Sequence, residues 1–257
     1  RLVVPRGKVL GGSSSINGLL YIRGQHADYD GWRQLGCAGW GWDDVAPYFR
    51  RAQHQERGDC EWHATGGPLN VSDVTTKHPV SDAVIEACAQ AGIPRNDDVN
   101  AGAQEGATYY QLTVKNGQRC SAAVAYLHPA MNRPNLKVET NALAGRVLFE
   151  GKRAVGVEFR QNGQKRVAMA RAEVILAGGA INSPQLLQLS GVGPGELLNR
   201  HGIEVVADLP GVGENLQDHY VMSVRYRLKA GVVSVNEQSK GGRLAGEALK
   251  YLFQRKG

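Results

Sequence analysis

The segment that most constrains the fold of this chain is the glycine- and serine-rich run Arg6–Asn17. It combines three glycines, three consecutive serines and two cations within twelve residues. Glycines let a backbone pass close to a ligand, and amides, hydroxyls and cations together suit a diphosphate or another anion. The apolar residues Leu19–Ile22 follow and can wall a flat ring. The segment fits a phosphate-bearing cofactor with a planar group, and on composition alone it fits a surface loop equally well.

Length and composition are those of a globular protein. The chain has 257 residues, enough for one large domain or two ordinary ones, and 42% of them are hydrophobic. The formal charge is +6 and the pI is about 9.2, which fits a phosphate-rich ligand. The basic residues are scattered, however, and no nucleic-acid-binding signature is present. We therefore expect no nucleic-acid partner.

Cysteine usage and hydropathy narrow the class further. Cys37, Cys60, Cys88 and Cys120 form no CxxC pair, so neither a zinc site nor a thioredoxin-like motif is expected, and we predict no metal. No stretch approaches the roughly 18 apolar residues of a membrane span, and no signal peptide is visible. We predict a cytoplasmic protein, with peripheral membrane association left open. The chain starts without Met and stops just after a helical pattern, which indicates a piece of a longer protein.

The residue pattern predicts both helices and strands. Asp43, Asp44 and Pro47 are typical of a helix start, and a second helix is expected from a cap at Ser81 to Gly92. A third helical segment is expected over 121–131. Alternating apolar residues predict an antiparallel meander of three strands. The expected strands are Leu136–Thr140, Val147–Phe149 and Val155–Phe159.

A second glycine motif lies after the expected meander. Glu173–Ala177 is a short apolar run that we interpret as a buried strand, and Gly178-Gly179 closes it. Ser183 and Pro184 then suit the cap and first position of a helix that ends at Gly191. A strand, a glycine pair and a helix form the ligand-binding geometry of an open α/β sheet.

Three segments together resemble the glucose–methanol–choline (GMC) oxidoreductases. Gly7–Asn17, with Tyr21, Gly24 and Asp30 downstream, resembles the first signature of that family. Gly179–Gly193 resembles the second, and Gly211–His219 resembles a further block. Their order and spacing make the match specific, and it covers essentially the whole chain. The residues of these motifs are most similar to the bacterial choline dehydrogenase-like and alcohol dehydrogenase-like branch.

The resemblance implies an α/β fold in which a Rossmann-type FAD-binding domain is interleaved with a substrate domain built on an antiparallel sheet. Residues 1–72 would belong to the FAD-binding domain and its flavin-covering lid. Residues 73–130 would belong to the substrate domain. Residues 131–222 would return to the FAD-binding domain, and 223–257 would begin a further substrate-domain segment.

The resemblance also implies which residues bind FAD. Ser13 and Asn17 match residues that hold the pyrophosphate and the flavin side, and Leu20 and Tyr21 match residues along the isoalloxazine. The backbone of Val147 would contact the adenine. The full set of predicted cofactor-binding residues is Arg6, Gly7, Gly11, Gly12, Ser13, Asn17, Gly18, Leu20, Tyr21, Val147, Ala177, Gly178 and Gly179.

The implied activity is oxidation of an alcohol, choline or another primary alcohol, to an aldehyde by hydride transfer to flavin N5. The electron acceptor would be a quinone, another carrier or oxygen. Two family features are missing from these residues. The GxGxxG dinucleotide motif is expected before Arg1, and the catalytic histidine with its partner histidine or asparagine is expected beyond Gly257. This span alone is therefore expected to be inactive. The alternative is a non-catalytic flavin-binding family member. A serine hydrolase is disfavoured because no G-x-S-x-G elbow occurs.

The histidines and tryptophans allow further predictions about flavin attachment and about which of these side chains are exposed or packed. Some family members link flavin covalently through a histidine in the first signature; Ile16 stands there and no histidine occurs between Arg1 and Gln25, so we expect non-covalent FAD. His219 follows Asp218, but the matching block is structural and cofactor-adjacent rather than catalytic. His26 is a weaker candidate for proximity to the flavin. Surface positions are expected for His54, His63, His78 and His201, and packing rather than an aromatic cage for Trp32, Trp40, Trp42 and Trp62.

Overall fold

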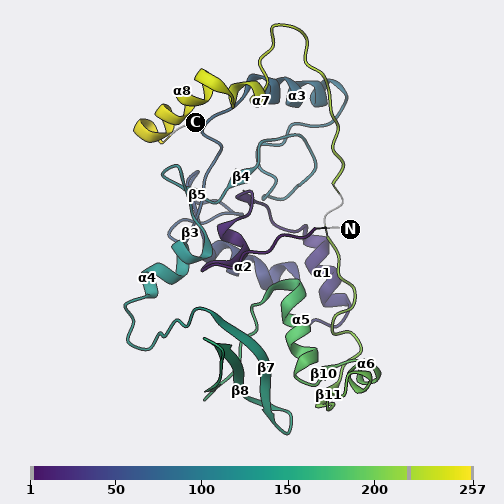
Figure 1. Ribbon diagram of the computed structural model, residues 1–257. Helices are drawn as coiled ribbons and strands as arrows, with labels where there is room; N and C mark the ends of the chain where they lie inside the picture. The colour runs from purple at the N-terminus through teal and green to yellow at the C-terminus, as the bar shows by residue number, and fades with distance from the viewer. Residues whose placement is uncertain (1–2, 219–220, 256–257) are drawn as a thin grey trace. The chain divides into compact units, whose positions relative to one another are not determined.

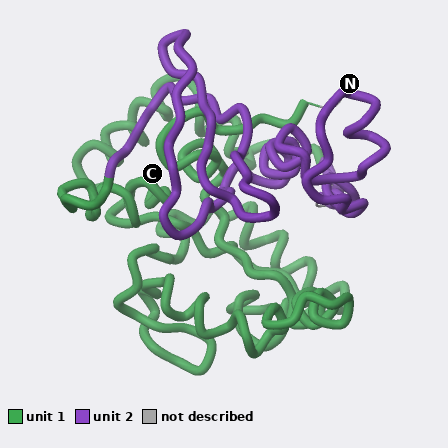
Figure 2. The backbone as a smooth tube through the Cα atoms, turned by 90° about the horizontal axis from the view of Figure 1, so that it is seen from below, with its two compact units in different colours: residues 1–136, 226–257 green, residues 137–225 purple. Residues whose placement is uncertain are grey.

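The computed structural model describes residues 3–218 and 221–255 (Figure 1). Contacts between residues divide the chain into two compact units, residues 1–136 with 226–257, and residues 137–225 (Figure 2). Both units contain helices and strands, as the expected α/β class requires. The assignment of segments to an FAD-binding and a substrate domain is a functional one and stays a prediction.

Among the described residues, the first unit has three small sheets of two strands each. The pairs are β1 (Leu20–Tyr21) with β4 (Gln111–Leu112), β2 (Gln53–Gln55) with β3 (Leu69–Val71), and β5 (Val114–Lys115) with β6 (Gln118–Arg119). The β2–β3 pair is parallel and the others are antiparallel. The interior of these sheets is unusually polar, because Gln53, Gln55 and Asn70 are buried beside Val71.

The first unit also contains helices. They are α1 (His26–Gln34), α2 (Trp42–Ala52), α3 (Pro79–Gln90), α4 (His128–Ala130), α7 (Val235–Gln238) and α8 (Gly241–Gln254), with a 3-10 turn, η1 (Gly12–Ser15), and a π-helical turn, η2 (Ala123–Leu127). The acidic start predicted for α2 is confirmed, because Asp44 Oδ2 accepts from the Gly41 N–H at 3.0 Å. The cap predicted at Ser81 is wrong. The helix begins at Pro79, whose fixed φ suits the first turn, and His78 Nδ1 caps it by accepting from Val80 N–H.

Aromatic rings fill the space where α1 packs against α2. The His26 and Trp42 rings stack with centroids 3.9 Å apart, and Tyr29 meets Phe49 edge-on at 5.7 Å. Trp32 and Trp40 also contact each other, at 6.2 Å. Aromatic pairs of this kind add about 0.5–1.5 kcal/mol each beyond the area they bury. Trp32, Trp40 and Trp42 therefore make packing contacts, as predicted.

The second unit contains the antiparallel meander. Its strands are β7 (Ala142–Glu150), β8 (Arg153–Gln161) and β9 (Gln164–Met169), and they are followed by α5 (Gly179–Leu189), α6 (Gly195–Arg200) and the parallel pair β10 (Val192–Gly193) and β11 (Ala207–Asp208). α5 packs on β7, where the Val147 N–H donates to Ser190 Oγ at 2.8 Å. The predicted turn at Glu150–Lys152 is confirmed, and so is the end of the helix before Gly191.

Three predictions for residues 136–184 are wrong. Leu136–Thr140 is not a strand, and the third strand is instead β9, whose residues are all exposed. Glu173–Ala177 is irregular and Ile175 is 77% exposed, because a strand needs a ladder partner and the described residues supply none. The helix begins at Gly179, so Ser183 and Pro184 lie within α5 rather than at its cap.

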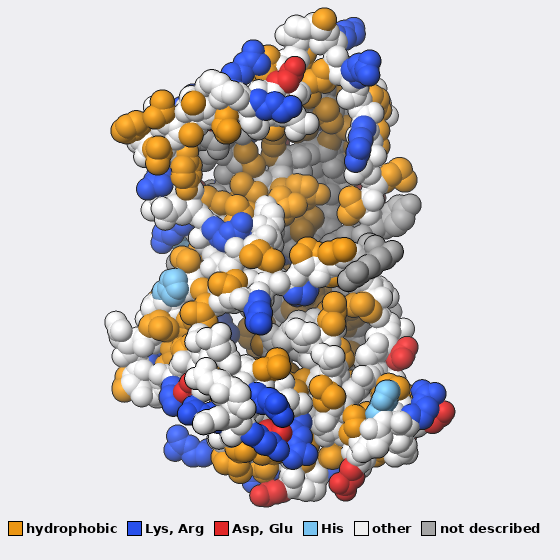
Figure 3. Space-filling model, in the orientation of Figure 1, with side chains coloured by type: hydrophobic (Ala, Val, Ile, Leu, Met, Phe, Trp, Pro, Cys, Tyr) orange, Lys and Arg blue, Asp and Glu red, His pale blue; other side chains and the backbone are white. Residues whose placement is uncertain are grey.

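Large apolar side chains are frequent on the surface, and Figure 3 shows many of them on one face. In α8, for example, Leu252 is 64% exposed and Phe253 is 84% exposed. Of the helices in residues 3–218 and 221–255, none is long and apolar enough to cross a bilayer.

Candidate functional site

The signature loop, Arg6–Asn17, folds tightly on itself within the first unit. A Cβ added to Gly7 would overlap the carbonyl of Gly12, so the backbone of the loop touches itself at these two residues. Gly11 has φ +87° and a Cβ there would lie 2.5 Å from Ser15 Oγ. The loop needs glycine at these two positions for its own closure, before any ligand is considered.

The three serine hydroxyls of the loop have different roles. Ser14 Oγ donates to Gly11 O at 2.5 Å and accepts from Ala122 N–H at 2.9 Å, and Ser15 Oγ donates to Leu10 O at 2.8 Å. These two hydroxyls therefore hold the loop together. Ser13 Oγ accepts from Gly7 N–H at 3.2 Å, which uses a lone pair and leaves its proton to donate elsewhere. Of the three, Ser13 is the one prepared to donate to an anionic oxygen.

Arg119 anchors the loop from β6, and sequence reasoning missed it. Its Nη1 donates to Ser14 O at 3.0 Å and to Asn17 Oδ1 at 2.7 Å. Asn17 Oδ1 also accepts from Leu19 N–H at 3.1 Å. With the oxygen used twice, the described contacts leave the Nδ2 group of Asn17 as its donor for a ligand. A residue 102 positions away along the chain thus orients the predicted flavin-side amide.

The residues next to the loop form an exposed apolar edge. Ile16 is 51% exposed and Leu20 is 51% exposed, whereas Tyr21 is half-buried and its O–H donates to Gln53 Oε1 at 3.0 Å. Neighbouring residues of a strand point to opposite faces. A ring lying on this edge would therefore meet the Leu20 side chain, and Tyr21 would contribute through its backbone. Arg6 and Gly18 are also exposed, and a Cβ on Gly18 would meet nothing within 4 Å.

The remaining predicted cofactor residues lie in the second unit. Val147 is 4% exposed, and its N–H is already paired with Ser190. Gly178 N–H donates to Ser183 Oγ at 2.9 Å. Val157, Leu176 and Ala177 are among the residues that line an apolar cavity of about 410 Å³. The predicted residues therefore form two groups, one in each unit.

A buried polar cluster lies behind β1. It consists of Tyr21, Arg23, Gln53, His63, Asp98 and Asn100. Arg23 is 5% exposed, and its guanidinium donates to Gln53 Oε1 at 2.5 Å and Trp62 O at 2.9 Å. The surface position predicted for His63 is wrong, because this side chain is 2% exposed and sits inside the cluster. A histidine in a polar loop gave no sign of this burial, since its partners are distant in sequence.

The hydrogen bonds of the cluster determine the tautomer of His63. Gln53 Oε1 accepts from both Tyr21 O–H and Arg23, so Gln53 Nε2 is the donor to His63 Nδ1 at 2.8 Å. Nδ1 is therefore an acceptor. The ring proton must lie on Nε2, which donates to Asp98 Oδ2 at 2.7 Å. His63 therefore joins the Gln53 amide to the Asp98 carboxylate.

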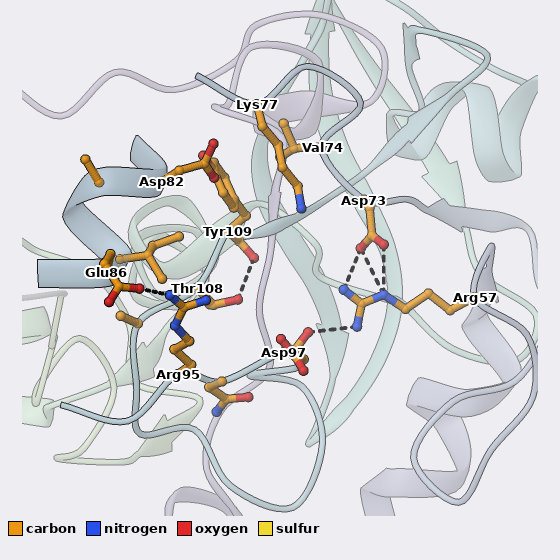
Figure 4. A pocket seen from close by; sticks show the side chains of 14 residues that line it. Arg57, Asp73, Val74, Lys77, Asp82, Glu86, Arg95, Asp97, Thr108 and Tyr109 are labelled. Atoms are coloured by element: carbon orange, nitrogen blue, oxygen red, sulfur yellow. Dashed lines mark hydrogen bonds and ion pairs between the residues drawn. The ribbon is translucent and has the colours of Figure 1, made fainter. Parts of the chain in front are cut away.

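Asp98 links this cluster to a surface cavity. Burial alone would raise its pKa, but hydrogen bonds from His63 and the Asn100 N–H and the nearby Arg57 charge bring the pKa of this carboxyl below its ordinary value. Arg57 is also paired with Asp73 at 2.8 Å, on one side of a cavity of about 590 Å³ (Figure 4). Glu86 and Arg95 form an ion pair on the other side.

The other histidines are less informative. His26 is the first residue of α1, and its Nε2 is buried with no partner among the described contacts; its proximity to a flavin stays a prediction. His201 is exposed as predicted, whereas His54 and His78 are half-buried. His219, for which a structural rather than a catalytic role was predicted, lies outside the described residues.

Comparison with known proteins identifies the family of this chain. A family model described as GMC oxidoreductase matches residues 1–221. The chain belongs to the GMC oxidoreductase family. The resemblance seen in the signatures is confirmed, and so is the fold class that it implied.

Among curated GMC relatives, the chain is 54% identical over 215 residues to "Choline dehydrogenase, mitochondrial" of Homo sapiens, covering 84% of the chain and 36% of the relative. It is 51% identical over 218 residues to "Oxygen-dependent choline dehydrogenase" of Brucella anthropi, covering 85% and 40%. The chain therefore spans well under half the length of these relatives.

Solved structures of the family have the same fold. The chain matches an FAD-dependent oxidoreductase from Chaetomium thermophilum with a TM-score of 0.92 and 30% identity, covering 99% of this chain and 47% of that one. It also matches pyridoxine 4-oxidase from Mesorbium loti with a TM-score of 0.75 and 33% identity, covering 80% and 41%.

Proposed function

We propose that the protein to which this chain belongs oxidises a primary alcohol, choline or a related one, to its aldehyde with FAD. The observation that carries the proposal is the signature loop. Its Ser13 proton and Asn17 amide are available to a ligand beside the exposed apolar edge of Ile16 and Leu20. The relatives' names, choline dehydrogenase in both curated cases, support the substrate class.

The residues of the loop fit the pyrophosphate and the flavin of such a cofactor. The Ser13 hydroxyl would donate to a pyrophosphate oxygen, with Arg6 supplying positive charge nearby. Asn17 Nδ2 would donate to a flavin edge, and Leu20 would exclude water from the ring. In the second unit, Ala177–Gly179 and the backbone of Val147 would hold the adenosine half, Val147 without its N–H, which Ser190 occupies. FAD itself supplies the hydride acceptor for alcohol oxidation.

The same loop supports non-covalent attachment. Covalent flavin needs a nucleophilic side chain at the contact, and Ile16 has none. In the domain assignment that we propose, residues 1–72 and 131–222 bind FAD, and 73–130 with 223–257 belong to the substrate domain. The electron acceptor is a quinone, another carrier or oxygen, and this choice is left to the experiment.

The experiment uses the full-length protein from the complete reading frame. We expect a yellow protein whose flavin is released into the supernatant by acid precipitation; flavin retained in the pellet would reject non-covalent binding. Choline, an aliphatic alcohol and an aryl alcohol are then assayed with an artificial acceptor, with and without oxygen. Bound flavin without oxidation of any alcohol would favour a flavin-binding protein over an enzyme.

A variant pair tests the loop directly. Asn17→Leu removes the amide and adds bulk at the proposed flavin contact, so flavin content should fall severalfold. Asn132→Leu changes an exposed asparagine outside the signature loop and should retain full flavin. Full occupancy in the Asn17 variant would reject the assignment of this residue.

A further inference from the structure

The strand next to the signature loop is held from its inner side by the buried polar cluster. Tyr21 O–H donates to Gln53 Oε1 at 3.0 Å, and Asn100 Nδ2 donates to Tyr21 O at 3.1 Å. The Arg23 N–H donates to Asn100 Oδ1 at 2.8 Å, and Gln104 Nε2 donates to Arg23 O at 2.5 Å. Side chain and backbone of this short segment are therefore both fixed, while Leu20 faces outward.

Arg23 is at the centre of this arrangement. Besides Gln53 Oε1 and Trp62 O, it donates through Nε to Tyr21 O–H at 3.3 Å, and its guanidinium lies 5.4 Å from the Phe49 ring centroid. These are neutral partners, and the carboxylate of Asp98 is reached only through His63. Burying a charge among neutral groups costs desolvation free energy, so Arg23 is not expected to add much to the stability of the fold. Its planar fork, however, can fix several acceptors in one geometry.

We propose that Arg23 and Gln53 are positioning residues for the flavin-facing edge of β1. Gln53 Oε1 is the point where the Tyr21 hydroxyl and the Arg23 guanidinium meet, and the amide nitrogen of Gln53 fixes His63 behind it. Through Tyr21 these two residues set where Leu20 and the end of the signature loop lie against the ring. The inference rests on the proposed function, because it concerns the same flavin contact.

The decisive variant is Arg23→Lys in the full-length protein. Lysine keeps the positive charge, but its three N–H donors share one nitrogen and cannot reproduce the planar fork in which Nε, Nη1 and Nη2 reach Tyr21, Trp62 O and Gln53 separately. We expect FAD to bind the apo-protein roughly tenfold more weakly, and the visible absorption band of the bound flavin to shift because the ring contacts change. FAD titration of the apo-protein and the absorption spectrum of the holoenzyme measure these two effects.

Arg50→Lys is the matched control. Arg50 lies on α2, and its Nη1 donates to Cys60 O and Glu61 O at the protein surface, so it supports the segment next to Trp62 from outside the cluster. This variant should keep the affinity and the flavin spectrum of the wild type. If Arg23→Lys also keeps both, the inference is wrong.

Tyr21→Phe decides the case in which Arg23→Lys does not fold. It removes only the hydroxyl that joins β1 to Gln53 and Arg23, and it should weaken FAD binding about threefold with a spectral shift in the same direction. An unchanged spectrum and affinity would overturn the inference. A wild-type protein that binds no FAD would instead overturn the proposed function, so the two failures are distinguishable.

Discussion

The signature loop and the buried polar cluster lie in the same unit and use polar groups in opposite ways. The loop is closed by contacts between residues close in sequence, such as Ser15 with Leu10, and it leaves the Ser13 proton and the Asn17 amide for a ligand. The cluster joins residues far apart in sequence, such as Arg23 and Asn100, and keeps its groups away from solvent.

This difference distinguishes groups that can contact a ligand from groups that hold a strand in place. Groups that contact a ligand must be left partly unsatisfied by the protein, and the loop has such groups at its surface. Groups that hold a strand in place must be fully satisfied, since a buried polar atom without a partner costs about 1–3 kcal/mol. Variants in the loop should therefore affect flavin binding first, and variants in the cluster should affect stability as well.

The largest effect is expected from Gly7→Ala. A Cβ at this position would overlap the Gly12 carbonyl, so the loop cannot close as it does in the structure. Overpacking costs about 3 kcal/mol, and most of the bound flavin should be lost. Flavin content and thermal unfolding of the purified full-length protein measure both consequences. Wild-type values for both would mean that closure of the loop is not needed.

Gly18→Ala is the comparison variant for Gly7→Ala. A Cβ on Gly18 meets nothing within 4 Å and its backbone is in an ordinary conformation, so the unfolding temperature of the apo-protein should not change. Loss of flavin from this variant at unchanged apo-protein stability would indicate close approach of the cofactor to Gly18, which is the predicted role of this glycine.

A smaller effect, on the cluster side, is expected from Asp98→Asn. The pKa of Asp98 is lowered in the folded protein, so the ionised carboxylate stabilises the fold. This stabilisation is present above the unfolded pKa of about 3.9 and is lost as the pH falls through the folded value. At pH 7 the variant should be less stable by about 2 kcal/mol, because a charged acceptor of the His63 N–H is replaced by a neutral one.

Urea unfolding of wild type and variant between pH 7 and pH 3 measures this difference. The gap should shrink toward the acidic end, because the pH there falls below the unfolded pKa of Asp98 and toward its lowered folded pKa. Asp97→Asn is the control, since Arg57 contacts Asp97 through its backbone carbonyl, which the variant keeps. A gap that is constant with pH would show that the charge of Asp98 does not contribute.

The same contrast explains what could be predicted from the sequence. The loop is a local motif, so its glycines and serines were visible in one stretch of twelve residues. The different hydrogen-bonding roles of Ser13, Ser14 and Ser15 could not be predicted, because they depend on partners such as Ala122, which is 108 residues away from Ser14. Arg119 was missed for the same reason.

The cluster could not be predicted at all from local patterns. His63 was expected at the surface, yet the side chains of Gln53 and Asp98 enclose it. In the second unit, the apolar run Glu173–Ala177 suggested a buried strand, but hydrophobicity alone does not provide a ladder partner. The β8 strand and the turn before it were predicted correctly because alternation and turn residues are local signals.

The smallest effect is expected from Ser14→Ala, which tests how the loop is joined to the rest of its unit. The variant loses the bond to Gly11 O and leaves the Ala122 N–H without its acceptor, at a cost of about 1 kcal/mol. The Ala122 amide should exchange hydrogen faster, while the flavin spectrum should stay unchanged because Ser14 faces the protein. Ser15→Ala removes an exposed bond and should cost only a few tenths of a kcal/mol. A spectral change in Ser14→Ala would place this hydroxyl at the ligand rather than in the support of the loop.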